Sequence, residues 1–86
     1  MDLQKYKIDF LTFTSNDYVL SNCADITFYN NGATAIVLNN SVTIQPGNSL
    51  ALSANFNEID TTTYNFFFIP NGNRVNKLVV FRKIYY

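Results

Sequence analysis

Residues 64–69 are the segment that most constrains the fold of this chain. In an extended strand, Tyr64, Phe66 and Phe68 lie on one face, and Phe67 and Ile69 lie on the other. A strand that is bulky and apolar on both faces requires cover on both sides, so we predict a central position for it. The Pro-Asn-Gly-Asn segment at 70–73 ends the strand, because proline donates no ladder hydrogen bond and glycine adopts positive φ.

The rest of the chain consists of short alternating segments separated by turn signals every 8–12 residues. This pattern is typical of an all-β fold, and it predicts a small antiparallel β-sandwich of about eight short strands or a closed barrel. With 86 residues the chain forms one domain, 1–86. Residues 1–17 are interpreted either as an edge strand or as an N-terminal arm. The expected strands are 3–13, 18–20, 24–29, 34–38, 42–44, 49–56, 64–69 and 75–86.

Three turns punctuate these strands. Asn30-Asn31-Gly32 is the strongest hairpin signal, because a primed two-residue turn requires positive φ at both central positions and Asn-Gly allows it. Residues 39–41 and 46–48 are predicted to form the other two turns. In 49–56, the alternation of apolar residues favours a strand over a short helix capped by Asn48 or Ser49.

Composition excludes several classes of protein. The chain has no histidine and a single cysteine, so it lacks the ligands of a zinc site and cannot form an internal disulfide. We interpret Cys23 as a core residue, and we expect no cofactor and no metal. Six basic residues balance six acidic ones, which argues against nucleic-acid binding. No run approaches the ~20 apolar residues of a membrane span, and the N-terminal residues lack the hydrophobic region of a signal peptide.

An enzyme needs positioned acids, bases or nucleophiles. Glu58 and Asp60 are the one carboxylate pair worth considering, since residues two apart in an extended segment face the same way. We favour a structural interpretation, in which Asp60 accepts hydrogen bonds from the backbone that follows it. The chain is therefore expected not to be an enzyme.

Two segments are candidates for contact with partners. Near the N-terminus, Tyr6, Ile8 and Phe10 share one face of the expected first strand. Near the C-terminus, basic and aromatic residues are mixed. Three interpretations of this segment stay open: a cationic strand face, a nucleic-acid contact, or a source of ion pairs with an adjacent subunit. A domain this small, without disulfides or metal, is expected to gain stability from association. The predicted partner-binding residues are Tyr6, Ile8, Phe10, Arg82, Lys83, Tyr85 and Tyr86.

Tyrosines also stack on sugars, which makes a carbohydrate-binding module the alternative function. The tyrosines considered for this role are Tyr18, Tyr29, Tyr64, Tyr85 and Tyr86. Aromatic residues at strand ends more often complete the edge of a core.

The order of segments from Ala24 onward resembles a known family. The most specific parts are Glu-x-Asp-Thr-Thr-x-Tyr at 58–64 and Arg-Lys-x-Tyr at 82–85; Asp-Ile-Thr-Phe-Tyr-Asn-Asn-Gly at 25–32 and a generic Pro-Gly turn precede them. In these features, residues 24–86 are similar to small β-sandwich virion proteins of tailed phages of Bacteroidetes, crAss-like phages included. Residues 1–23 carry no match to that family.

The resemblance implies a non-enzymatic structural component of the phage particle: a head decoration, or part of a fibre or tail. Such a protein would be made in the cytoplasm of the bacterial host and located in the virion. Its expected partners are other virion proteins and copies of itself, with a trimer favoured. Surface glycans are the further partner that the alternative function implies.

Overall fold

The computed structural model describes residues 3–55 and 57–86, which form eight β-strands and no helix. The strands, in chain order, are β1 (Tyr6–Phe13), β2 (Asp17–Leu20), β3 (Asp25–Asn30), β4 (Ile36–Leu38), β5 (Val42–Ile44), β6 (Ser49–Ser53), β7 (Thr63–Phe68) and β8 (Leu78–Tyr85). No helix in the described ranges is long and apolar enough to cross a membrane.

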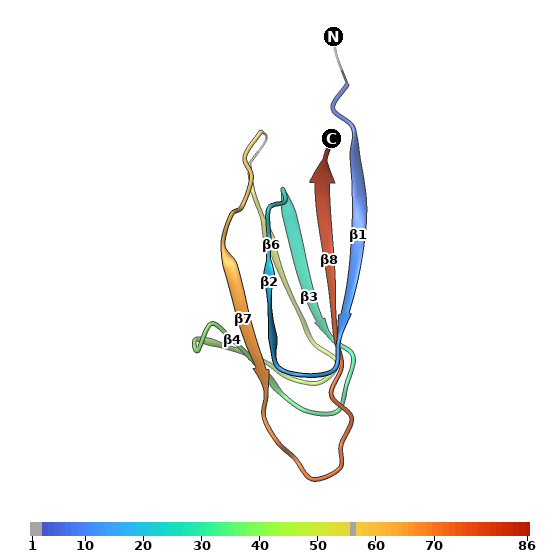
Figure 1. Ribbon diagram of the computed structural model, residues 1–86, viewed down its shortest axis with the longest axis vertical. Helices are drawn as coiled ribbons and strands as arrows, with labels where there is room; N and C mark the ends of the chain where they lie inside the picture. The colour runs from blue at the N-terminus through green and yellow to red at the C-terminus, as the bar shows by residue number, and fades with distance from the viewer. Residues whose placement is uncertain (1–2, 56) are drawn as a thin grey trace.

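The strands form two four-stranded sheets, in the orders β1-β8-β3-β6 and β2-β7-β4-β5. Every pairing is antiparallel. The molecule is elongated, with extents of 54 × 20 × 18 Å. β1 and β8 run side by side, so the start of β1 and the end of β8 lie at the same end of the molecule (Figure 1). The prediction of an all-β fold built as a small antiparallel β-sandwich is confirmed.

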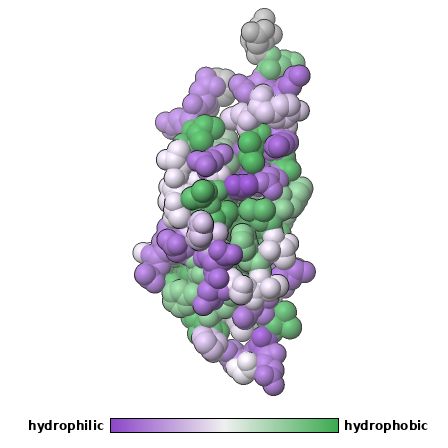
Figure 2. Space-filling model, viewed as in Figure 1, coloured by the Kyte–Doolittle hydropathy of each residue, from purple (hydrophilic) through white to green (hydrophobic). Residues whose placement is uncertain are grey.

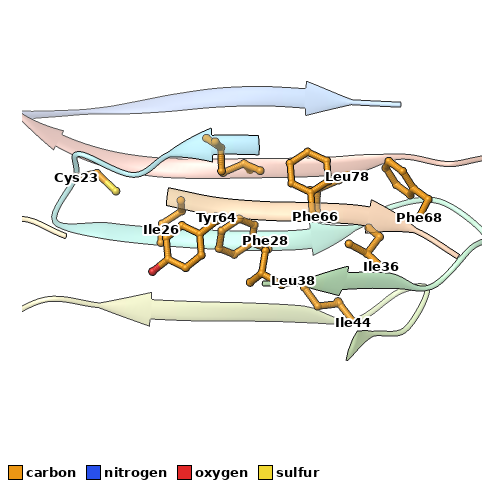
Figure 3. Packing of buried hydrophobic residues seen from close by; sticks show 12 residues of the cluster. Cys23, Ile26, Phe28, Ile36, Leu38, Ile44, Tyr64, Phe66, Phe68 and Leu78 are labelled. Atoms are coloured by element: carbon orange, nitrogen blue, oxygen red, sulfur yellow. The ribbon is translucent and has the colours of Figure 1, made fainter. Parts of the chain in front are cut away.

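The core lies between the two sheets, and β7 contributes one face to it (Figure 3). Tyr64, Phe66 and Phe68 are buried, whereas Phe67 and Ile69 are 38% and 40% exposed. β7 lies between β2 and β4, so its central position in a sheet is confirmed. The expected cover on both faces is wrong, because a two-layer sandwich covers each sheet on one side only.

The predicted Asn31-Gly32 hairpin is also wrong. β3 pairs with β6 and β8, while β4 belongs to the other sheet, so the segment between them crosses from one sheet to the other. Gly32 is required there by a close backbone approach. A Cβ at this position would lie 2.6 Å from the backbone nitrogen of Lys77 and 2.7 Å from the carbonyl oxygen of Val75.

The other two predicted turns are confirmed. Asn39 and Asn40 have positive φ angles of 49° and 54° in the connection between β4 and β5. Pro46 and Gly47, the latter with φ of 84°, occupy the centre of a turn closed by a 3.0 Å hydrogen bond from Asn48 N–H to the Gln45 carbonyl. These features match a type II turn, which favours proline and then glycine at its two central positions.

Residues 49–53 form strand β6, so the preference for a strand over a helix is confirmed there. Leu50 and Leu52 pack against the core from this strand. The part of that prediction that concerned Phe56 lies outside the described residues.

Asn30, which was predicted to belong to a turn, is a buried residue at the end of β3. The Asn30 side chain is fully buried, and its Nδ2 donates to the carbonyl oxygens of Thr34 at 2.8 Å and Ile44 at 2.9 Å. Its Oδ1 accepts from the Gly32 N–H at 3.1 Å. Asn30 thus links the end of β3 to the second sheet, through Thr34 just before β4 and Ile44 at the end of β5.

Candidate interaction surface

The first and last strands of the chain pair along their whole length. β1 is an edge strand of its sheet, and its register with β8 runs from Tyr6 opposite Tyr85 to Phe13 opposite Leu78. Alternation along both strands directs one set of side chains to the core and the other set to the outer face of the sheet. We call the outer set the aromatic face; its members are Tyr6, Ile8, Phe10, Val79, Phe81, Lys83 and Tyr85.

Side chains of the aromatic face contact one another. The rings of Phe10 and Phe81 meet edge to face, with centroids 5.4 Å apart and an interplanar angle of 88°. The Lys83 ammonium lies 4.6 Å from the centroid of the Tyr6 ring and 5.5 Å from that of Tyr85. These cation–π contacts hold three side chains of the face in a defined arrangement before any partner binds.

The aromatic face is exposed along β1 and half-buried along β8. Tyr6, Ile8 and Phe10 are 54%, 45% and 65% exposed. Figure 2 shows hydrophobic residues reaching the surface among hydrophilic ones in the view of Figure 1, including on the side where β1 and β8 lie. A contiguous apolar area on a small protein is a feature of interaction sites, whereas isolated exposed apolar residues are ordinary.

The charges on this side of the sheet balance. Lys83 is opposite Asp25 of β3 in the strand register, and their charged atoms are 4.0 Å apart. This ion pair is partly exposed, so it contributes little to folding stability. It leaves the surface around the aromatic residues without a net charge to repel a second copy.

The structure places Arg82 away from the other predicted partner-binding residues. Its side chain points to the inner side of the sheet and forms an ion pair with Asp9, the residue opposite it in β1. It also donates to the carbonyl oxygens of Leu20 at 2.8 Å and Ser21 at 3.3 Å. Arg82 therefore joins β8 to β1 and to the end of β2, which differs from the expected cationic surface.

Tyr86 lies just beyond β8 and is 72% exposed. Its backbone N–H donates to the Lys5 carbonyl at 3.1 Å, which continues the pairing of the two chain ends. Of the seven predicted residues, five share the aromatic face, and Tyr86 extends beyond it. Val79 and Phe81 were not among the predicted partner-binding residues, although their alternation with Leu78 and Val80 places them on the same side as Lys83.

Glu58 and Asp60 serve the local backbone. A Glu58 carboxylate oxygen accepts from the Asn55 N–H at 2.9 Å. Asp60 accepts from the Thr62 N–H at 2.8 Å through Oδ1, and from the Tyr64 hydroxyl at 2.6 Å through Oδ2. The structural interpretation of Asp60 is confirmed. In 3–55 and 57–86, no group of three or more potential metal ligands is present.

The hydrogen bond between Asp60 and Tyr64 changes the acidity of both groups. Burial raises the pKa of the Asp60 carboxyl, but the hydrogen bonds from Tyr64 and Thr62 outweigh it and leave the pKa below its usual range. Burial and the hydrogen bond to Asp60 together raise the pKa of Tyr64 to about 12. Tyr64 therefore remains a neutral donor to an ionised carboxylate across the neutral range.

This pair predicts a pH dependence of stability. Because the pKa of Tyr64 is higher in the folded state than its ordinary value of 10, its stabilising effect is complete below pH 10 and is lost as the pH rises toward 12. We expect Tyr64→Phe to lower the free energy of unfolding by about 1 kcal/mol at pH 7 through loss of the hydrogen bond. Urea denaturation at several pH values measures the difference between wild type and variant. A difference that stays constant or grows above pH 10 would contradict the assignment.

Cys23 is buried at one end of the core (Figure 3), and its interpretation as a core residue is confirmed. Burial raises the pKa of its thiol to about 11. The thiol is therefore protonated and a poor nucleophile at neutral pH.

The tyrosines that were considered for sugar stacking do not form one cluster. Tyr64 is in the core, and Tyr18 lies on β2, in the opposite sheet from Tyr85. Tyr29 is on β3, opposite Val79 of β8.

Comparisons of the chain with protein-family models, with curated proteins and with solved structures found no match. The resemblance to phage virion proteins thus stays a prediction that depends on the sequence features described above.

Proposed function

We propose that the protein is a non-enzymatic structural component of a phage virion, which decorates or attaches to the particle by associating with copies of itself and with other virion proteins. The observation that carries this proposal is the aromatic face on β1 and β8. It is apolar, partly exposed and electrically balanced, and its side chains are held by contacts with one another. The resemblance of residues 24–86 to virion proteins supports the same function.

The size of the sheet indicates how such an association would work. β1 and β8 have eight residues each, whereas β3 and β6 have six and five, so the mean strand length is about 23 Å. Four strands span about 15–19 Å, so the outer face has a footprint of roughly 350–450 Å². A standard stable interface buries about 800 Å² on each partner. One face alone therefore favours weak, concentration-dependent association. Repeated contacts in a closed oligomer or on a particle surface would raise its effective strength.

The native mass of the purified protein at low and high concentration tests the association. We expect a closed oligomer, with a trimer favoured, to form as concentration rises. Phe10→Glu should shift the protein to the monomer, because it places a charge within the aromatic face. The matched control is Tyr18→Glu, which changes a similarly exposed aromatic residue on an edge strand of the other sheet and should leave the oligomer intact.

A wild-type protein that is monomeric at all concentrations would contradict self-association through this face. Equal dissociation by Phe10→Glu and Tyr18→Glu would contradict the choice of face. Circular dichroism of both variants shows whether the sheets remain folded, so that loss of structure is not mistaken for loss of association.

The location in a virion requires a separate experiment. An antibody against the chain should label intact phage particles purified from the cells that express it, and negative-stain electron microscopy would locate the label on the head, fibre or tail. Recovery of the chain in the particle-free fraction alone would contradict a virion role even if the protein forms oligomers.

A further inference from the structure

A polar hollow lies on the outer face of the second sheet, on strands that the aromatic face does not include. Its volume is about 410 Å³. It lies between β7 and the turn that connects β4 to β5, and it is lined by Asn39, Asn40, Thr63, Asn65, Phe66 and Phe67. Because Thr63, Asn65 and Phe67 alternate along one face of β7, their side chains form a floor about 13 Å long.

Hydrogen bonds hold the turn beside this floor. The Asn39 N–H donates to the Asn65 carbonyl at 2.7 Å, and the Asn65 N–H donates to Asn39 Oδ1 at 2.7 Å. Asn39 and Asn40 both have positive φ, a conformation that asparagine tolerates better than most residues. The shape of the hollow is thus formed by hydrogen bonds between the turn and β7, one of them from backbone to backbone and the other to the Asn39 side chain, without a ligand.

Several polar groups in the hollow have no partner in the protein. Within 3–55 and 57–86, the carboxamides of Asn40 and Asn65 and the hydroxyl of Thr63 make no hydrogen bond. All three residues are exposed. Each carboxamide offers two donor hydrogens and an acceptor oxygen, and the hydroxyl offers both functions. These groups are free to bind a ligand that carries closely spaced donors and acceptors.

The lining also indicates the charge and shape of that ligand. None of the six lining residues is charged, so the hollow lacks the groups that usually bind a phosphate, a carboxylate or a metal ion. The side chain of Phe67 is 38% exposed beside the amides. A partly exposed aromatic ring next to neutral hydrogen-bonding groups suits a molecule with an apolar C–H face and several hydroxyls.

We propose that this hollow binds a neutral carbohydrate, with the apolar face of a sugar ring against Phe67 and its hydroxyls hydrogen-bonded to Asn40, Asn65 and Thr63. The site is independent of the aromatic face, and the inference holds whether or not the protein is part of a virion. It also differs from the sugar stacking on tyrosines that the sequence suggested, because none of the lining residues is a tyrosine.

Saturation-transfer-difference NMR with the full-length protein tests the proposal, because it detects weak binding. The probes are maltose, cellobiose, lactose and N,N′-diacetylchitobiose at millimolar concentration, with glucuronic acid as the charged comparison. We expect transfer to at least one neutral disaccharide. Phe67→Ala should weaken that binding about tenfold, by loss of the ring contact.

The matched control is Ile69→Ala, which truncates a residue of nearly equal exposure on the same side of the chain, two positions beyond Phe67 and outside the hollow. It should leave binding unchanged. Asn40→Gly is a second test that removes the carboxamide while allowing the positive φ, so it remains informative if Phe67→Ala does not fold. It should also weaken binding.

Three results would overturn the proposal. The first is no transfer to any of the four neutral disaccharides by the folded wild-type protein. The second is equal binding by wild type, Phe67→Ala and Asn40→Gly. The third is a loss of binding in Phe10→Glu with none in Phe67→Ala, which would assign the sugar to the aromatic face.

Discussion

Phe66→Ala is expected to lower the free energy of unfolding by about 3–5 kcal/mol, because it removes a large buried side chain and leaves a cavity. The Phe66 side chain is 3% exposed, and its ring meets those of Phe13 and Phe68 with centroids 4.9 Å and 6.1 Å apart. Phe13 belongs to the other sheet, so the substitution weakens packing between the two layers. Small domains have total stabilities of about 5–15 kcal/mol, and this single change removes a large part of that.

The neighbouring residue provides a matched control. Phe67 is the same residue type on the same strand, but it faces outward and is 38% exposed. We expect Phe67→Ala to cost less than about 1 kcal/mol, as for a surface substitution. Urea denaturation followed by circular dichroism measures both variants. Equal losses at the two positions would show that both faces of β7 are covered, which would contradict the two-layer architecture.

Asn30→Ala is expected to lower the free energy of unfolding by about 3 kcal/mol. The carboxamide satisfies the carbonyl oxygens of Thr34 and Ile44 and the N–H of Gly32 in a fully buried position. A buried polar group left without its partner costs about 1–3 kcal/mol, and entry of water into the vacated space would reduce the sum. Denaturation in urea at pH 7 gives the loss.

Asn31→Ala is the control for this prediction, since Asn31 is the next residue in the chain and is exposed. Its substitution should change stability by less than about 0.5 kcal/mol. Asn30→Asp should be at least as damaging as Asn30→Ala at pH 7, because a carboxylate would face two carbonyl oxygens. A folded Asn30→Asp protein as stable as wild type would refute the hydrogen-bonding role of the amide.

The positions of most strands and turns could be predicted from local patterns. Alternation of apolar residues locates a strand because its side chains point to opposite faces with a period of two. The turn at Pro46-Gly47 and the hydrogen bonds that Asp60 accepts from Thr62 and Tyr64 depend on residues at most four positions apart. Such features need no knowledge of the rest of the chain.

The candidate sites were less accessible to the same reasoning. Tyr6, Ile8 and Phe10 could be assigned to one face from their spacing alone. Their contacts with Phe81 and Lys83 depend on the pairing of the first strand with the last, which joins residues 65 to 79 positions apart. The polar hollow was not predicted, because its walls come from a turn and a strand that are also distant in the sequence.

By itself, the sequence determined the fold class, the approximate strand boundaries and the alternation of each strand, because all three follow from side-chain size, polarity and local backbone preference. Only the tertiary structure decided which face of β7 is covered, since Phe66 and Phe67 are chemically identical and the choice depends on the opposite sheet. It likewise decided that Gly32 permits a close backbone approach, that Arg82 turns inward to Asp9, and that Asn30 joins the two sheets. The outcomes for Gly32 and Arg82 depend on partners far away in the chain, and that for Asn30 depends on the path of the segments that follow β3. Both the pairing of distant segments and the path of the chain between sheets follow from packing summed over the whole molecule.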